Sequence, residues 1–427
     1  WCTADIGWEV LSQIRKAQFG ESLLAGLVIA LIAMLIDRVT SGFANHSSNY
    51  QNASKTSISS NAYLLFAIFG SLLLYLLAMA IPTLDVWPRE MEVSPARSMN
   101  EGLTYIIVNF REQIESIKTF AFFFLMLPAK IGLQGSVSPF TWGFELQAWH
   151  SIGYGVSMSL MALWCGWRFN QQAAFVVVLF AIFFYVGLTK MPWLAVIIIY
   201  SFIAWKAGGY KLGIATFTGL LFLASSGIWP ETMLSVYLCG IAVIISFLAG
   251  SILGIWAAKN NTVSAILRPI NDTLQTMPLF VILIPFVMIF KIGEFTALLA
   301  IIAYAIVPAI RYTEHGLRNL PSGVIEAAKM MGCTDKQMLW SVKIPLALPV
   351  MMLGLNQTIM FGIAMLVIAA LVGTNGLEQT VYIGLSDGNF GVGLIAGMGL
   401  AIIAMIADRM TQSWSLRRQN KYGISAD

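Results

Sequence analysis

Residues 326–345 read EAAKMMGCTDKQMLWSVKIP, between one apolar run that ends near 312 and another that begins near 348. Helix signals punctuate this stretch. Ser322 is placed to act as the N-cap of a first short helix, and Gly332 suits the left-handed position that ends it. Thr334 and Gln337 form a capping box that starts a second helix. The stretch therefore predicts a folded loop of two short helices separated by a glycine.

Composition places this loop in a membrane protein. Apolar residues make up 58% of the chain and charged residues 11%, whereas soluble domains carry about 25% charged residues. Residues 232–258 and 348–373 each exceed the roughly 20 apolar residues that cross a bilayer. Neither stretch contains Lys, Arg, Asp or Glu, each of which costs about 2.5–3.5 kcal/mol at a helix centre. We expect an all-α polytopic membrane protein.

Apolar runs predict about eleven transmembrane helices. The shorter run at 119–131 breaks at Pro128 and Lys130, so we expect it to lie in the membrane interface with the amphipathic stretch 100–118. The eleven spans are expected near 22–40, 60–82, 144–167, 173–189, 192–205, 212–229, 232–258, 278–291, 295–312, 348–373 and 391–408.

The distribution of basic residues predicts the orientation. The segment 313–347 contains four Lys or Arg residues, whereas 374–390 contains none. Basic loops favour the cytoplasmic side, so we expect the first segment inside and the second outside. The tail 417–427 is then cytoplasmic. The net charge of +4 fits these loops better than a nucleic-acid surface.

One span is repeated. Residues 19–40 and 390–411 are identical at twelve of 22 positions, at a constant offset of 371. We interpret 1–42 as a partial repeat, the last span of another copy of the C-terminal region, and expect native sequence or a separate piece before it; a single decorative span is the alternative. Five regions follow: 1–42, a linker at 43–59, extra spans with an amphipathic external segment at 60–189, a core at 190–416 and the tail 417–427.

The loop resembles the EAA loop of binding-protein-dependent ABC importer permeases, E-A-A-x3-G-x9-I-x-L-P, with Val342 in place of Ile and Ile344 in place of Leu. The resemblance implies a coupling-helix loop that docks on a cytoplasmic ABC ATPase. Pro345 is expected to stop the second helix before the next span. The residues that carry the match, and the ATPase coupling it implies, are Glu326, Ala327, Ala328, Gly332, Ile344 and Pro345.

Two further motifs, Leu274–Pro278 with Ile284-Pro285 and Gly354–Met360, look like those of glycine betaine/proline betaine and choline permeases over about 190–415. The insertion at 128–189 is similar to that of the larger trimethylamine N-oxide permeases. The resemblance implies ATPase subunits that carry ATP and Mg, a periplasmic or lipid-anchored substrate-binding protein, and a second permease domain as a homodimer or fused pseudo-dimer. It also implies a multi-pass protein of the bacterial cytoplasmic membrane.

Seven polar or helix-breaking residues are candidates for the translocation pathway. Buried amides need hydrogen-bond partners, so the polar run at 356–358 faces either another helix or the pathway. A proline break such as that at 278 marks either a pathway or an elbow at the span entrance. The candidates are Gln275, Thr276, Met277, Pro278, Asn356, Gln357 and Thr358. Asp37-Arg38 and Asp408-Arg409 are expected to be interfacial anchors.

The sequence favours a permease without catalysis over other classes. It contains no phosphate-binding loop of the G-x-x-x-x-G-K-[ST] type and no metal-ligand spacing of its three histidines, so no cofactor is expected in this chain. A secondary transporter would show ionisable residues in mid-membrane, and none is placed there. An ABC permease for another small solute, such as an amino acid, remains the alternative, and a secondary transporter is a further one.

Overall fold

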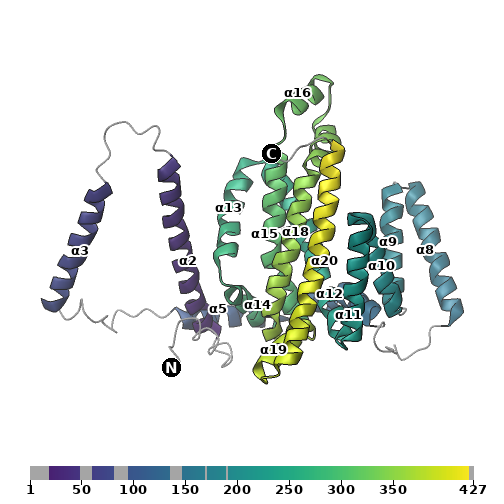
Figure 1. The fold of residues 1–427 in the computed structure, drawn as a ribbon, viewed down its shortest axis with the longest axis horizontal. Coiled ribbons are helices and arrows are strands. Elements are labelled where there is room, and N and C mark those ends of the chain that lie inside the picture. The colour runs from purple at the N-terminus through teal and green to yellow at the C-terminus, as the bar shows by residue number, and fades with distance from the viewer. Residues whose placement is uncertain are drawn as a thin grey trace. The chain divides into compact units, whose positions relative to one another are not determined.

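The computed structural model describes residues 19–48, 60–80, 95–134, 147–168, 171–188 and 191–422, and every regular element in these ranges is a helix (Figure 1). The chain forms two compact units, residues 1–106 and 107–427. The all-α fold expected from the sequence is confirmed for these ranges.

The first unit contains α2 (Phe19–Ser48), α3 (Ser60–Ala80) and the beginning of α5 (Ala96–Asn109). A Cβ atom on Gly20 would come within 2.6 Å of the Ala96 carbonyl oxygen, so glycine lets α2 and α5 approach closely. α2 runs six residues into the range 43–59 predicted as a linker. The remainder of that linker, 49–59, and residues 1–18 lie outside the described ranges.

The second unit is built on a bundle of four long helices, in which α15 packs between α12 and α18, and α18 packs on α20. Small residues permit these contacts. A Cβ on Gly254 of α12 would lie 2.7 Å from Thr313 Cβ of α15, and one on Gly354 of α18 would lie 2.6 Å from Tyr312 Cβ. Close backbone approach at glycine is typical of membrane helix pairs. The four helices are α12 (Trp229–Lys259), α15 (Glu294–Arg318), α18 (Ile344–Ala369) and α20 (Phe390–Tyr422).

Shorter helices surround this bundle. α10 and α11 pair with each other and α10 contacts α20, while α8 pairs with α9. Figure 1 places α16 beyond one end of the bundle, at the top, and α19 at the opposite end. We call these the loop end and the far end. The surrounding helices are α8 (Ala148–Arg168), α9 (Gln171–Leu188), α10 (Trp193–Gly208), α11 (Tyr210–Ser225), α13 (Asn261–Thr276), α14 (Leu279–Phe290), η5 (Ala370–Val372) and α19 (Leu377–Ser386).

Six helices in the described residues are long and apolar enough to cross a membrane, or seven if α13 and α14 count as one broken span. The prediction of eleven spans is therefore not confirmed. The run predicted near 278–291 forms only the 12-residue α14, about 18 Å at 1.5 Å per residue, which is shorter than the hydrocarbon core. α13 and α14 meet at a bend of 102°.

The apolar run that is interrupted at Pro128 and Lys130 lies in a continuous helix. α6 (Arg111–Ala121), the π-helix η3 (Phe122–Met126) and α7 (Leu127–Gln134) follow without interruption, and residues 111–133 pass as a candidate span. The Leu127 N–H donates to the Phe122 carbonyl, five residues back. Because the wider π turn changes the register just before the proline, the helix tolerates its missing N–H and its ring. Residues 119–131 were placed in the membrane interface because their apolar run is short. The 23-residue candidate span at 111–133 counts against that placement.

Candidate coupling loop and pathway residues

The loop after α15 folds as two short helices around a glycine, as predicted. α16 (Ser322–Met330) ends in a Schellman motif, in which the Gly332 N–H donates to Lys329 O at 3.0 Å and the Cys333 N–H to Ala328 O at 3.2 Å. Gly332 has φ +79°, the left-handed conformation that glycine adopts without strain. The glycine is therefore required by the backbone, and the loop has a defined shape.

Of the two helix-start signals that flank this glycine, the capping box is confirmed and the N-cap is wrong. Thr334 and Gln337 form the predicted capping box at the start of α17 (Asp335–Gln337), with the Thr334 N–H donating to Gln337 Oε1 at 2.9 Å. The N-cap residue of α16 is Pro321, without a side-chain cap, so the assignment of Ser322 was wrong by one residue.

Pro345 does not stop the second helix. The π-helix η4 (Met338–Lys343) leads directly into α18, and the Ile344 N–H donates to Leu339 O, five residues back. A π turn also precedes Pro128, and at both prolines the change of helix register lets the helix continue. The loop is consequently joined to α18 by continuous, hydrogen-bonded helix.

The EAA residues divide between the surface and the base of the loop. Glu326 and Ala327 are exposed on α16, whereas Ala328 is buried. Ile344 packs against a buried cluster that includes Leu317 and contains Ala347 and Met351. The sequence did not indicate that the neighbouring Met330 and Met331 would be exposed, yet 90% and 85% of their surfaces are. Exposed methionines beside an exposed helix form an apolar tip suited to contact with another protein.

A paired charge network braces the base of the loop. Glu314, buried near the end of α15, accepts from Arg318 Nε at 2.8 Å and from Ser264 Oγ of α13 at 2.6 Å. Arg318 also donates to the Ala257 carbonyl of α12 at 2.7 Å. The network ties α12, α13 and α15 together. Glu314 and Arg318 are four residues apart on one helix, a spacing visible in the sequence, but their partners 50 or more residues away are not.

Asn356 lies at a helix–helix contact. Its Nδ2 donates to Asp408 Oδ1 at 2.8 Å, and Thr411 Oγ1 donates to Asn356 Oδ1 at 2.7 Å, so α18 is bonded to α20 through this amide. Thr358 is buried and donates to the Gly354 carbonyl of its own helix at 2.8 Å. Gln357 is partly buried. Asp408, predicted to be an interfacial anchor, takes part in packing α18 against α20.

The other predicted pathway group lies at the break between α13 and α14. Met277 and Pro278 adopt extended backbone at the 102° bend, and Gln275 is partly buried just before it. Thr276 Oγ1 donates to the Asp272 carbonyl at 3.0 Å, one turn back in its own helix. Asp272 is in turn paired with Arg311 of α15. The two predicted groups thus belong to different elements.

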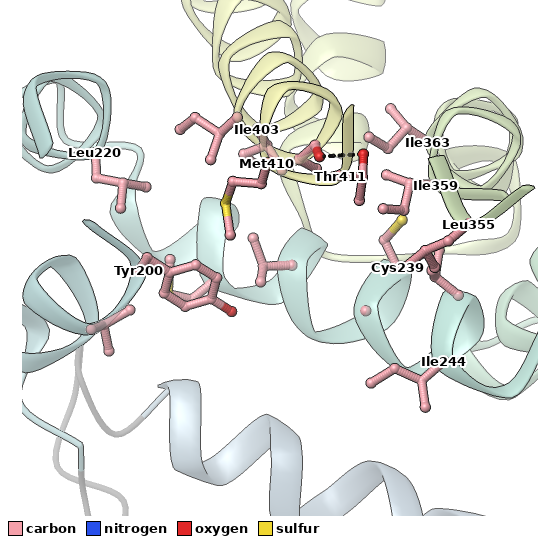
Figure 2. A pocket seen from close by; sticks show the side chains of 17 residues that line it. Tyr200, Leu220, Cys239, Ile244, Leu355, Ile359, Ile363, Ile403, Met410 and Thr411 are labelled. Carbon is pink, nitrogen blue, oxygen red and sulfur yellow. Dashed lines mark hydrogen bonds between the residues drawn. The ribbon is translucent and has the colours of Figure 1, made fainter. Parts of the chain in front are cut away.

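A cavity of about 360 Å³ opens between α10, α11, α12, α18 and α20 (Figure 2). One face of α18 lines it through Leu355, Ile359 and Ile363, and none of the seven predicted pathway residues does. Figure 2 shows Tyr200 and Thr411 at its wall; the Thr411 hydroxyl donates to Ala407 O at 2.9 Å. No charged side chain lines this cavity, so it suits apolar matter better than a charged solute.

Comparison with known proteins agrees with this geometry. The family described as "Binding-protein-dependent transport system inner membrane component" matches residues 250–414, which contain the loop, its base and three of the four bundle helices. The glycine betaine transport system permease OpuAB of Bacillus subtilis (strain 168) is 36% identical over 235 residues, 55% of this chain and 83% of that protein. The chain belongs to this family of binding-protein-dependent permeases.

Two further relatives indicate its place within the family. The glycine betaine/proline betaine permease ProW of Escherichia coli (strain K12) is 38% identical over 53% of this chain and 64% of that protein. The trimethylamine N-oxide permease TmoV of Pelagibacter ubique (strain HTCC1062) is 28% identical over 98% of this chain and 52% of that protein. The chain thus spans about half to two thirds of the length of these two relatives.

Among solved structures, the inward-facing MetNI methionine ABC transporter has a TM-score of 0.39 and 22% sequence identity over 47% of this chain and 97% of that one.

Proposed function

We propose that this chain is the permease subunit of an ATP-driven importer of small methylated amines or compatible solutes: glycine betaine, proline betaine, choline or trimethylamine N-oxide. The folded EAA loop carries the proposal, because its exposed apolar tip, its glycine-defined shape and its continuity with α18 suit a lever moved by a partner. Relatives named for glycine betaine and trimethylamine N-oxide transport support the cargo class.

The proposed partners follow from the loop. A cytoplasmic ABC ATPase, carrying ATP and Mg on its own chain, docks on α16, so the loop end and the C-terminus face the cytoplasm. Movement of the loop passes to α18 through η4 and to α13 through the Glu314 network. The ATPase must bind the two permease states with different affinities for this to drive transport. A substrate-binding protein and a second permease copy complete the proposed assembly.

For the pathway, the α13–α14 break supports a role of Gln275, Thr276, Met277 and Pro278, because interrupted helices often form the solute sites of membrane transporters. The bonds of Asn356 favour a structural role for it, and for Thr358, over direct contact with solute. The alternatives are an ABC permease for another small solute and a secondary transporter. For the latter, Asp408 is an ionisable group inside α20, but it is engaged by Asn356 and by Gln412 Nε2 at 2.6 Å.

Uptake of radiolabelled glycine betaine and trimethylamine N-oxide by proteoliposomes that contain the complete complex tests the proposal. We expect Glu326→Lys to reduce ATP-driven uptake at least tenfold while the permease remains folded, because it reverses a charge on the docking face. Glu101→Lys, a reversal at an exposed glutamate of α5, is the matched control and should transport normally. Normal uptake by the Glu326→Lys complex would overturn the coupling role, and no ATP-dependent uptake by the wild type would overturn the function.

A further inference from the structure

A second pocket, of about 440 Å³, lies at the far end, where α6 and η3 meet the connection between α14 and α15. In Figure 1 this connection is at the end of the bundle opposite α16. Its volume falls within the roughly 300–1,000 Å³ of small-molecule sites. Unlike the cavity of Figure 2, it is lined by both aromatic and charged side chains.

The aromatic walls come from two parts of the chain. Phe290 and Phe295 flank the α14–α15 turn with ring centroids 5.2 Å apart at 76°, and Phe122 and Phe123 of η3 are 5.6 Å apart at 82°. These edge-to-face pairs leave ring faces available for other contacts. Because η3 is a π-helix, two adjacent phenylalanines both reach the pocket.

The turn that joins α14 to α15 has an unusual backbone. Lys291 has φ +63° and Gly293 φ +152°, both in the region that side chains disfavour. The Thr296 hydroxyl donates to the Lys291 carbonyl and closes the turn. Strain of this kind persists only where the surroundings impose it, and it gathers at ligand sites. Phe290 and Phe295, which contact each other across this turn, both line the pocket.

Both signs of charge line the pocket. Glu294, with 13% of its side chain exposed, accepts from Lys130 Nζ at 2.6 Å and from the Tyr237 hydroxyl at 3.2 Å. Glu115 and Lys118 of α6 also line it, and within the described residues neither forms a salt bridge. The lining therefore has two carboxylates and two ammonium groups. A simple anion or cation would meet a like charge here, whereas a zwitterion can pair with both.

We propose that this pocket binds a small methylated zwitterion of the betaine type, with the methylated ammonium against Phe122 and Phe290 and the acid group near Lys118. Glu115 and Glu294 also line the pocket and contribute negative potential to it. Methylated ammonium groups are attracted by aromatic faces, and a free lysine suits a carboxylate. This inference rests on the proposed function, and it gives the permease its own solute site at the end facing away from the ATPase.

Binding of glycine betaine to the permease–ATPase complex in nanodiscs, without the binding protein, tests the site by calorimetry. We expect Phe122→Leu and Lys118→Gln each to raise the dissociation constant about tenfold, within the range of desolvated cation–π and charge-assisted contacts. Phe124→Leu is the matched control, since Phe124 belongs to the same π-helix but does not line the pocket; it should bind as the wild type. Basal ATP hydrolysis reports that each complex is folded.

Choline separates the two halves of the site, because it has the methylated ammonium without the acid group. Lys118→Gln should weaken glycine betaine but not choline, whereas Phe122→Leu should weaken both. Equal dissociation constants for Phe122→Leu, Lys118→Gln and Phe124→Leu would overturn the site, and so would undetectable binding by the wild type. If that wild-type complex still imports glycine betaine, the proposed function stands and the site alone fails; if it imports no methylated solute, the function itself fails.

Discussion

The two ends of the bundle use the same residue types in opposite ways. At the loop end the charges are paired inward, with Glu314 buried against Arg318, while apolar Met330 and Met331 are exposed. At the far end phenylalanines line a pocket, and charged groups share that lining. An exposed apolar tip on a braced base suits a protein partner, whereas an aromatic pocket with both charges suits a small solute.

The largest effect is expected from removing the charge network around Glu314 at the loop end. Glu314→Leu leaves Arg318 without its buried partner, and breaking such a pair costs about 3 kcal/mol. We expect a lower midpoint of thermal unfolding for the purified permease. Asp272→Leu is the control, because the Arg311–Asp272 pair is 41% and 47% exposed and such pairs contribute about 0–1 kcal/mol. Equal midpoints for the two variants would show that the network does not brace the loop end.

A smaller effect is expected in the loop itself. Gly332→Ala should destabilise the end of α16 by about 1 kcal/mol, because alanine disfavours its left-handed backbone. Gly323→Ala is matched to it: Gly323 lies within α16 with free space around it, so alanine should stabilise the helix by up to about 1 kcal/mol. Hydrogen exchange of residues 322–333, measured without the ATPase, should be faster in the first variant and slower in the second. Shifts of the same sign would contradict the assigned loop geometry.

What the sequence could predict at the two ends differs for a physical reason. The glycine at 332 and the capping box at Thr334 act on backbone within a few residues, so local signals sufficed. Pro345 was wrongly expected to stop a helix because a π turn, which leaves no clear mark in the sequence, carries the helix past it, as another does at Pro128. The Glu294–Lys130 pair joins residues 164 apart, and no local pattern reveals such a partner.

The candidate pathway residues show the same limit. Asn356, Gln357 and Thr358 were expected to face the bundle or the pathway, since buried amides require hydrogen-bond partners; Asn356 finds partners in α20 and Thr358 in its own helix. Which partner they find depends on how α18 is rotated against α20, and the apolar run around them does not specify that rotation. The bond from Asn356 to Asp408 therefore came from the structure, as did the far-end pocket.

Maleimide labelling in intact cells tests whether the loop end faces the cytoplasm and the far end the outside. Ser386 is exposed at the end of α19, and Cys333 lies in the loop. Cys165 and Cys239 are buried, and Cys2 is replaced by serine so that it does not react with the maleimide. An impermeant maleimide should label Ser386→Cys from outside, and native Cys333 only after the membrane is opened. Labelling of Cys333 but not of Ser386→Cys in intact cells would contradict the account.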